Sequence, residues 1–216
     1  MDNMSKLLIL TIGFDEKFPL RAVMRRGISK GDVILLITAT PIEERVKKAI
    51  NMFKRMVLNI AEDVKISVLE VPVEDLVKSV RLIRKGVERI GVRRIEVNLS
   101  GGMRILIIAT LLALSPFTNS LDIPIEMELE DGRAITEVKL KWFKVPTPGY
   151  EDVKIMKAIE TLGITTLDTL IKYLTAYPRS TLHRKLVKLV EMGFLIAERR
   201  GKRVYYKLSE LGMMYI

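Results

Sequence analysis

The sequence predicts an α/β domain with a mostly parallel sheet, followed by a small helix-turn-helix domain that ends in a β-hairpin. Two observations lead to this prediction. Up to residue 144, short continuous apolar runs alternate with longer amphipathic runs, a pattern typical of buried parallel strands and their covering helices. Beyond residue 149, three amphipathic segments precede two short strand-like runs around a basic turn that contains glycine.

Each apolar run of the first domain predicts a strand, and each amphipathic run predicts a helix. The expected strands are 7–12, 33–39, 65–71 and 94–98, then an antiparallel pair, 123–129 and 135–142, around Asp131-Gly132. The expected helices are 19–26, 42–60, 74–90, which ends at Gly91, and 103–114. Repeated strand–helix units predict a Rossmann-like sheet that is covered on both faces, with the antiparallel pair at one edge.

A proline-rich segment, Val145-Pro146-Thr147-Pro148-Gly149, predicts a stiff linker. We therefore expect a first domain over residues 1–144, a linker over 145–149 and a second domain over 150–216. Within the second domain, helices are expected at 152–162 and 166–173. Strands are expected at 194–199 and 203–208.

The third helix of the second domain has a clear pattern. It is expected to begin near Pro178–Ser180, where proline suits a first turn and serine a cap, and to end at Gly193. Its apolar side chains recur at helical spacing and consist of Leu182, Leu186, Leu189 and Val190. Three helices followed by a hairpin are the order of a winged helix-turn-helix, so we expect this domain to bind double-stranded DNA.

Charge is concentrated on this third helix and the hairpin. Residues 177–207 hold nine Lys or Arg and two Glu, which is +7 of the net charge of +10. A local positive stripe indicates a polyanion partner, although it is also compatible with a solvated helix face and a basic hairpin. The candidate DNA contacts are Arg179, Ser180, Thr181, His183, Arg184 and Lys188 on the helix and Arg200, Lys202 and Arg203 in the hairpin.

Two polar, glycine-containing loops are expected to meet in the first domain. For a strand order of 3-2-1-4, a ligand lies at the carboxyl ends of the first and fourth strands, where the order reverses. Thr11-Ile12-Gly13-Phe14-Asp15-Glu16 and Asn98-Leu99-Ser100-Gly101-Gly102-Met103-Arg104 follow these two strands. The Gly-Gly pair would expose backbone N–H groups to an anion, Ser100 could cap the next helix and donate to a phosphate, and Arg104 would add charge. The alternative is a tight turn with no ligand.

Several classes of site are disfavoured by composition. The chain has no cysteine and one histidine, His183, so thiol catalysis, disulfides and Cys- or His-based metal sites are not expected. It lacks both the Gly-x-Gly-x-x-Gly fingerprint and the Gly-Lys-Ser/Thr of a Walker loop. The polar start, Met1–Met4, predicts no signal peptide, and the longest apolar stretch, 105–114, is too short for a bilayer. We expect a cytoplasmic protein without a cofactor.

These loops, joined to a winged helix, resemble the CRISPR-associated Rossmann-fold (CARF) transcriptional regulators of archaeal type I-A systems. The resemblance covers essentially the whole chain and rests on Gly13-Phe14-Asp15-Glu16 and Leu99-Ser100-Gly101-Gly102-Met103-Arg104. It implies a two-fold dimer that binds a cyclic oligoadenylate, commonly the four-membered ring, across the dimer axis. The winged helices would then act on promoters of CRISPR arrays or adaptation genes.

The resemblance also implies the residues of the ligand site. One wall would consist of Thr11, Gly13, Phe14, Asp15 and Glu16, and the phosphate side of Asn98, Ser100, Gly101, Gly102, Met103 and Arg104. Thr38 and Thr40, at the end of the second strand, are added as candidates. The first alternative is a ring nuclease that cleaves cyclic oligoadenylate, assisted by Ser100 and Arg104. The second is a structural winged-helix module with an empty Rossmann domain.

Overall fold

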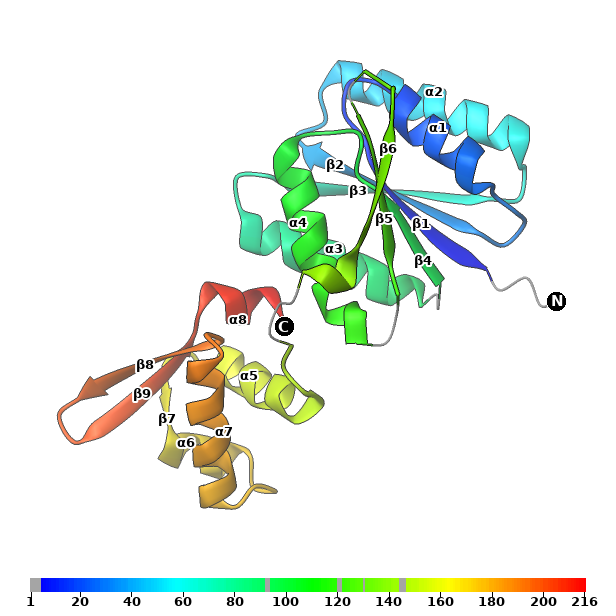
Figure 1. Ribbon diagram of the computed structural model, residues 1–216. Coiled ribbons are helices and arrows are strands. Elements are labelled where there is room, and N and C mark those ends of the chain that lie inside the picture. The colour runs from blue at the N-terminus through cyan, green and yellow to red at the C-terminus, as the bar shows by residue number, and fades with distance from the viewer. Residues whose placement is uncertain (1–4, 92–93, 120–121, 130, 144–146) are drawn as a thin grey trace. The chain divides into compact units, whose positions relative to one another are not determined.

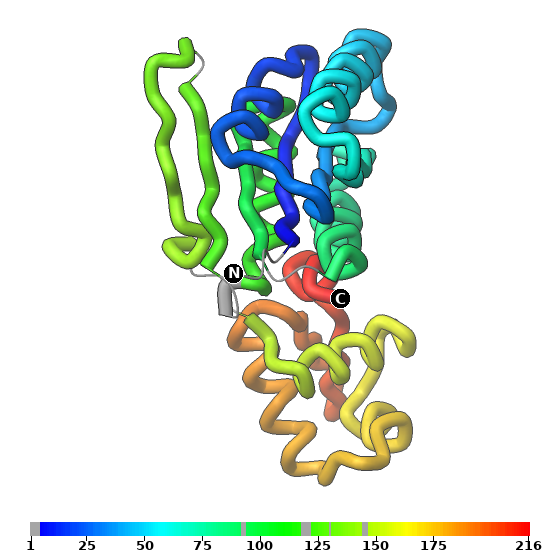
Figure 2. The backbone as a smooth tube through the Cα atoms, turned by 90° about the vertical axis from the view of Figure 1, so that its right-hand side faces the viewer, coloured from blue at the N-terminus to red at the C-terminus, as the bar shows by residue number. Residues whose placement is uncertain are grey.

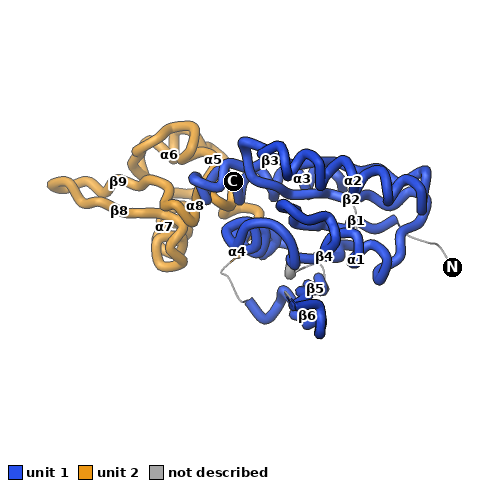
Figure 3. The backbone as a smooth tube through the Cα atoms, turned by 90° about the horizontal axis from the view of Figure 1, so that it is seen from above, with its two compact units in different colours: residues 1–145 blue, residues 146–216 orange. Residues whose placement is uncertain are grey.

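The computed structural model describes residues 5–91, 94–119, 122–129, 131–143 and 147–216 (Figure 1). The chain forms two compact units, residues 1–145 and 146–216 (Figure 3). The boundary between them lies within the expected linker, of which residues 145 and 146 fall outside the described residues.

The first unit is built on a six-stranded sheet with the order β3-β2-β1-β4-β5-β6. Its strands are β1 (Lys6–Thr11), β2 (Val33–Thr40), β3 (Lys65–Pro72), β4 (Arg94–Asn98), β5 (Pro124–Glu128) and β6 (Ile135–Lys139). The first five pair in parallel, and β6 is antiparallel to β5 at one edge of the sheet (Figure 2). The expected reversal of strand order between the first and fourth strands is therefore confirmed.

Helices cover both faces of this sheet. They are α1 (Lys17–Arg26), α2 (Glu44–Ile60), α3 (Leu76–Ile90) and α4 (Arg104–Leu114), with short 3-10 helices at Ser115–Asn119 and Leu140–Trp142. On one face, Leu8 and Leu10 of β1 pack with Val23 of α1 and Phe53 of α2 in one apolar cluster. All six residues of β1 are buried, which explains its unbroken apolar run. The last strand ends at Lys139 and not at residue 142, because 140–142 form a 3-10 turn.

The second unit has the winged helix-turn-helix arrangement that the sequence predicts. Its elements are α5 (Tyr150–Leu162), β7 (Thr165–Thr166), α6 (Leu167–Tyr173), α7 (Arg179–Glu191), β8 (Leu195–Arg200), β9 (Arg203–Leu208) and α8 (Glu210–Met214). The three strands form a sheet with the order β7-β9-β8, in which β8 and β9 are the hairpin, or wing. The short β7 and α8 were not expected from the sequence pattern.

The recognition-type helix α7 is fixed by its buried face and by its end. Leu182, Leu186 and Leu189 are fully buried, as their spacing predicts. Gly193 has a φ of 79°, and the Phe194 N–H donates to the Leu189 carbonyl at 2.9 Å, which is a Schellman end. The expected serine cap is wrong, because α7 begins directly after Pro178 without a side-chain cap.

Candidate functional site

A pocket of about 340 Å³ opens at the carboxyl ends of β1 and β2, beside the start of α4. Its lining residues are Ile12, Gly13, Phe14, Thr38, Ala39, Pro41, Glu43, Val46, Gly102, Met103, Arg104 and Leu106. The two loops that the sequence singled out therefore meet at one pocket, which lies where the strand order reverses. Gly13, Phe14, Thr38, Gly102, Met103 and Arg104 are the candidate ligand residues that the structure places on it.

Three glycines let the two loops touch backbone to backbone. A Cβ on Gly13 would lie 3.0 Å from the Gly102 Cα, and a Cβ on Gly101 would lie 2.7 Å from the Thr11 carbonyl oxygen. Gly101 is thus required by packing, and it is buried behind the pocket. Although it was predicted as a ligand contact, it does not line the pocket. Gly102 is exposed, lines the pocket and has a φ of 81°, which favours glycine.

The pocket wall is mostly apolar, with one exposed aromatic ring. The Phe14 side chain is 55% exposed, and the Arg45 guanidinium lies 5.0 Å from its ring centroid. Such a surface suits a planar ring system that carries negative charge beside it. Sequence reasoning missed Arg45 and the lining residues Pro41 and Glu43. They lie between the carboxyl end of β2 and the first turn of α2, so the strand-end rule could have found them if applied to β2 as well.

Arg104 is the cation best placed for an anion in this pocket. It is the first residue of α4, it is exposed, and it makes no ion pair or side-chain hydrogen bond within the part of the chain that the structure describes. No side chain caps the α4 N-terminus. The Leu106 N–H donates to the Met103 carbonyl at 2.9 Å, which leaves the Arg104 and Ile105 amides for an anion. The predicted Ser100 cap is wrong, since the Ser100 Oγ accepts a hydrogen bond from the Glu128 N–H at 2.8 Å.

Two further candidates are buried behind the pocket wall. Asn98 is 1% exposed, its Nδ2 donates to Glu126 Oε1 at 3.2 Å and its Oδ1 accepts from the Ser100 N–H at 3.2 Å. Thr11 is fully buried, and its Oγ1 has no hydrogen-bond partner among the residues that the structure describes. The structure places both behind the pocket and not on its lining, because a side chain at the end of a central strand can turn into the domain as readily as out of it.

Three other candidates lie beside the pocket without lining it. Asp15 accepts a hydrogen bond from the Lys17 N–H at 2.8 Å and so starts α1, with Glu16 as the residue before the helix. Thr40 pairs with Pro72 of β3 at the end of the strand. These three residues therefore have local structural roles, and they do not line the pocket.

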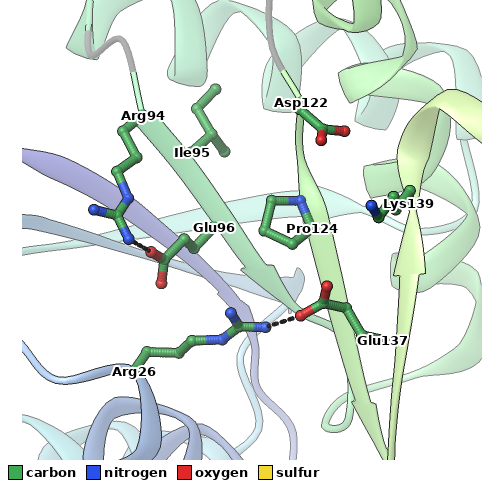
Figure 4. A pocket seen from close by; sticks show the side chains of 8 residues that line it. All are labelled: Arg26, Arg94, Ile95, Glu96, Asp122, Pro124, Glu137 and Lys139. Atoms are coloured by element: carbon green, nitrogen blue, oxygen red, sulfur yellow. Dashed lines mark hydrogen bonds and ion pairs between the residues drawn. The ribbon is translucent and has the colours of Figure 1, made fainter.

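A second pocket, of about 320 Å³, lies at the opposite end of the sheet, where β4 and β5 begin (Figure 4). Its three carboxylates already have cationic partners. Glu96 pairs with Arg94 at 2.7 Å and Glu137 with Arg26 at 3.1 Å, as drawn in Figure 4. Asp122 pairs with Lys141, which lies outside the pocket, at 3.4 Å. These charges are balanced within the protein. The first pocket, at the ends of β1 and β2 beside the start of α4, is therefore the stronger candidate for a ligand site.

The polar face of α7 carries most of the candidate DNA contacts. Ser180, His183, Arg184 and Lys188 are exposed, and Thr181 is half-buried. Arg179 is also exposed, and its Nη1 lies 2.5 Å from Asp168 Oδ1. This ion pair lowers the pKa of the Asp168 carboxyl through the hydrogen bond from Arg179. Arg179 would therefore have to exchange a partner before it could meet DNA.

A buried carboxylate ties α7 to the start of α5. Lys185 Nζ lies 2.8 Å from Asp152 Oδ1, and Lys188 Nζ lies 4.0 Å from Oδ2. Burial acts to raise the pKa of Asp152, but the hydrogen bonds from Lys185 and the Gly149 N–H outweigh it and lower that pKa. Sequence reasoning placed Lys188 at DNA and did not foresee this partner, since Asp152 lies on another helix.

The wing presents its cations around one acidic side chain. Arg200, Lys202 and Arg203 lie at its tip, which turns through Gly201-Lys202 with a φ of 62° at Gly201. Glu198 accepts from Lys207 at 2.7 Å and from Arg200 at 2.8 Å, and these hydrogen bonds lower its pKa to about 2. The wing therefore contains an internal anion that competes with phosphate for two of its cations.

Two kinds of feature are absent from the described residues. Among residues 5–91, 94–119, 122–129, 131–143 and 147–216, no His, Cys, Asp and Glu side chains group in threes to hold a metal ion. Across those same ranges, every helix is too short or too polar to cross a bilayer.

The first unit matches a known domain family. Residues 6–139 match the Csa3 CRISPR-associated Rossmann-like domain, which is of the CARF type. No protein of curated function has a detectably similar sequence.

Solved structures are similar to parts of the chain. Csm6 of Enterococcus italicus, bound to cyclic hexa-2′-fluoro-hexa-dAMP, is 13% identical with a TM-score of 0.49; the match covers 88% of this chain and 56% of that one. BlaI of Bacillus licheniformis, in its monomeric form with the blaP half-operator, is 22% identical with a TM-score of 0.28, over 30% of this chain and 83% of that one. The family match covers more than half of the sequence, and the chain therefore belongs to the family that carries the Csa3 CRISPR-associated Rossmann-like domain.

Proposed function

We propose that the protein is a DNA-binding transcription regulator of a CRISPR system that responds to cyclic oligoadenylate. One observation carries the proposal. A single chain joins a CARF-type domain, with an open pocket at the reversal of its strand order, to a winged helix whose exposed face is basic. The first feature suits a nucleotide signal and the second suits duplex DNA.

The ligand side of the proposal rests on the chemistry of the pocket. Phe14 offers a ring for an adenine to stack on, and Arg104 with the first two amides of α4 offers a site for a phosphate. A cyclic oligoadenylate of four units repeats its adenine and phosphate groups around a two-fold axis. Each protein chain, however, has only one pair of pocket loops. The proposal therefore includes an isologous homodimer with the ring bound across its axis.

The DNA side rests on α7 and the wing. An exposed Arg184 on a helix that is anchored by three buried leucines is suited to reading base edges in the major groove, with the wing cations at phosphates. Ligand would act by population shift, because it binds better to one arrangement of the two winged helices than to another. In this scheme the ligand is a signal, and the protein needs neither a cofactor nor a catalytic residue.

The test is a titration of cyclic tetra-adenylate into the purified protein by calorimetry, paired with a DNA-binding assay at fixed salt with and without the ligand. We expect one ring per two chains and a change in DNA affinity of about tenfold or more. Linear tetra-adenylate is the matched control. The proposal is wrong if the cyclic ligand binds no better than the linear one, or if it leaves DNA affinity unchanged. Conversion of the labelled ring to linear products would indicate the nuclease alternative.

A further inference from the structure

Two buried carboxylates on β5 are held by arginines from α1. Glu126 and Glu128 are 4% and 9% exposed. Arg25 Nε donates to Glu126 Oε1 at 2.8 Å, and Arg25 Nη1 donates to Glu128 Oε2 at 3.1 Å. Arg21 Nη2 lies 2.7 Å from Glu128 Oε1. Buried carboxylates are costly unless paired in this way, so the pairing defines how α1 and β5 lie against each other.

The same network reaches β6. Arg26 Nε donates to Glu126 Oε2 at 2.9 Å, and its Nη2 donates to Glu137 Oε2 at 3.1 Å, a contact visible in Figure 4. One guanidinium therefore bridges both strands of the β5–β6 hairpin. In the sequence, β6 is followed by Leu140–Trp142 and then by the expected linker, so this hairpin is the last strand element before the second unit.

From these carboxylates, hydrogen bonds continue to the loop between β4 and α4. Asn98 Nδ2 donates to Glu126 Oε1 at 3.2 Å, and Asn98 Oδ1 accepts from the Ser100 N–H at 3.2 Å. The Ser100 Oγ in turn accepts from the Glu128 N–H at 2.8 Å. The loop is thus fastened at two points directly before Gly102 and Arg104, which line the ligand pocket.

We infer that Asn98 and Ser100 are positioning residues of the ligand site, which hold the pocket loop to the Glu126 carboxylate and the Glu128 backbone N–H and so link it to the β5–β6 hairpin. This inference rests on the proposed function. It names residues that shape the ligand site without touching the ligand. An apolar core at this place would be at least as stable, but directional hydrogen bonds specify one loop position. The hairpin would respond when ligand moves the loop, because Asn98 on the loop side and Arg26, which reaches β6, both donate to the Glu126 carboxylate.

Asn98→Asp is the variant that separates positioning from folding. The new carboxylate still accepts the Ser100 N–H, but it replaces the amide donor to Glu126 by a like charge. The bond between loop and hairpin is lost, while the turn within the loop remains. Glu126 itself is left unchanged in this test, because Arg25 and Arg26 both donate to its carboxylate.

Two readouts apply to each variant: amide hydrogen exchange over residues 100–105 without ligand, and calorimetric affinity for cyclic tetra-adenylate. Asn98→Asp should speed exchange about tenfold and weaken ligand binding about tenfold, the effect of one charge-assisted hydrogen bond. Glu137→Gln, which removes the exposed partner of Arg26 on the same hairpin, should leave both unchanged.

Each outcome decides the inference. It is overturned if Asn98→Asp exchanges like the wild type over residues 100–105, or if it binds the cyclic ligand as tightly as the wild type. A wild type that binds no cyclic oligoadenylate would refute the proposed function, while the exchange measurement would still decide whether the network holds the loop. If circular dichroism shows that Asn98→Asp is unfolded, Ser100→Ala takes its place. It removes only the acceptor for the Glu128 N–H and should speed exchange over the same residues.

Discussion

Gly13 and Gly102 bring the two pocket loops into backbone contact, since a Cβ on Gly13 would lie 3.0 Å from the Gly102 Cα and 3.3 Å from its nitrogen. The atoms on both sides of this contact belong to the backbone, so neither loop can yield by a side-chain rotation. Phe14 and Arg104, which follow these two glycines in sequence, both line the pocket, so the contact helps to position the pocket wall.

Gly13→Ala should therefore disturb the pocket and the fold together. We expect a loss of about 1–3 kcal/mol in the free energy of unfolding, because the added methyl group overpacks a rigid contact. Ligand affinity should fall as well. Gly149→Ala is the control, since a Cβ there would make only an ordinary contact of 3.5 Å with Asp152. Equal melting temperatures for Gly13→Ala and the wild type would contradict this view of the contact.

Arg104→Ala should remove the response to ligand and leave DNA binding alone. The loss of one charge-assisted contact is typically about 1.5–3 kcal/mol, or roughly tenfold to a hundredfold in affinity. Calorimetry with cyclic tetra-adenylate measures the first effect, and a DNA-binding assay without ligand measures the second. Arg55→Ala, an exposed arginine of α2 that does not line the pocket, is the matched control. Unchanged ligand affinity in Arg104→Ala would exclude it from the phosphate site.

Arg184 should contribute to sequence-specific DNA binding, whereas Lys202 should contribute to binding that does not depend on sequence. Both are exposed, and neither forms an ion pair within the described residues. Arg184→Ala should cost about 1–3 kcal/mol at particular base pairs. Lys202→Ala should weaken binding to all sequences alike and lower the salt slope by about one. Binding measured on operator and non-operator duplexes at several salt concentrations distinguishes the two. If Arg184→Ala weakened both duplexes equally, α7 would not be reading bases.

Glu198→Gln should strengthen DNA binding. Glu198 has a pKa of about 2, so it is ionised at neutral pH and holds Arg200 and Lys207. Its neutral variant frees both cations for phosphate, so affinity should rise about twofold to tenfold with a steeper salt slope. Glu191→Gln removes the same charge from an exposed residue without an ion pair in the described chain, so it corrects for net charge. Equal gains in both variants would argue against release of the wing cations.

Asp152→Asn should lower the stability of the second unit in a pH-dependent way. The amide can still accept the Gly149 N–H, but the ion pair with Lys185 is lost, at a cost of about 1–3 kcal/mol. The folded-state pKa of Asp152 lies below its ordinary value of 3.8. The pair therefore contributes stability above that pH, and the contribution disappears as the pH falls through the lowered value.

Chemical unfolding between pH 7 and pH 2 measures this effect. The wild type should lose unfolding free energy below about pH 4 more steeply than Asp152→Asn does. Asp168→Asn is the control, because Asp168 also pairs with a cation of α7 but lies exposed to solvent. Parallel curves for the wild type and Asp152→Asn would show that the ion pair does not stabilise the unit.

Local patterns predicted most of the elements, and physical reasons explain this. The unbroken apolar runs of β1 and β2 belong to strands that are buried on both faces, and the spacing of Leu182, Leu186 and Leu189 belongs to one buried helix face. The order of the parallel strands reverses between β1 and β4, which brings their loops together as expected.

These local patterns did not predict the direction in which individual side chains point. Asn98, Ser100 and Gly101 lie in the loop that the sequence singled out, yet Asn98 turns toward Glu126, Ser100 toward Glu128 and Gly101 against Thr11. Their partners are distant in sequence, so no local pattern marks them. The burial of a carboxylate on β5 and its pairing with Arg25 on α1 emerge only when the sheet is assembled.

The amino-acid sequence by itself determined two domains, the parallel sheet with its reversal of order, the basic winged helix and the two loops of the pocket. These follow from periodicity, turn residues and charge, which act over short stretches of chain. Only the tertiary structure decided which loop residues face the pocket and which are held behind it. That choice depends on how each polar group finds a partner once water is excluded, and for Asn98 and Ser100 those partners lie 28 residues away on β5.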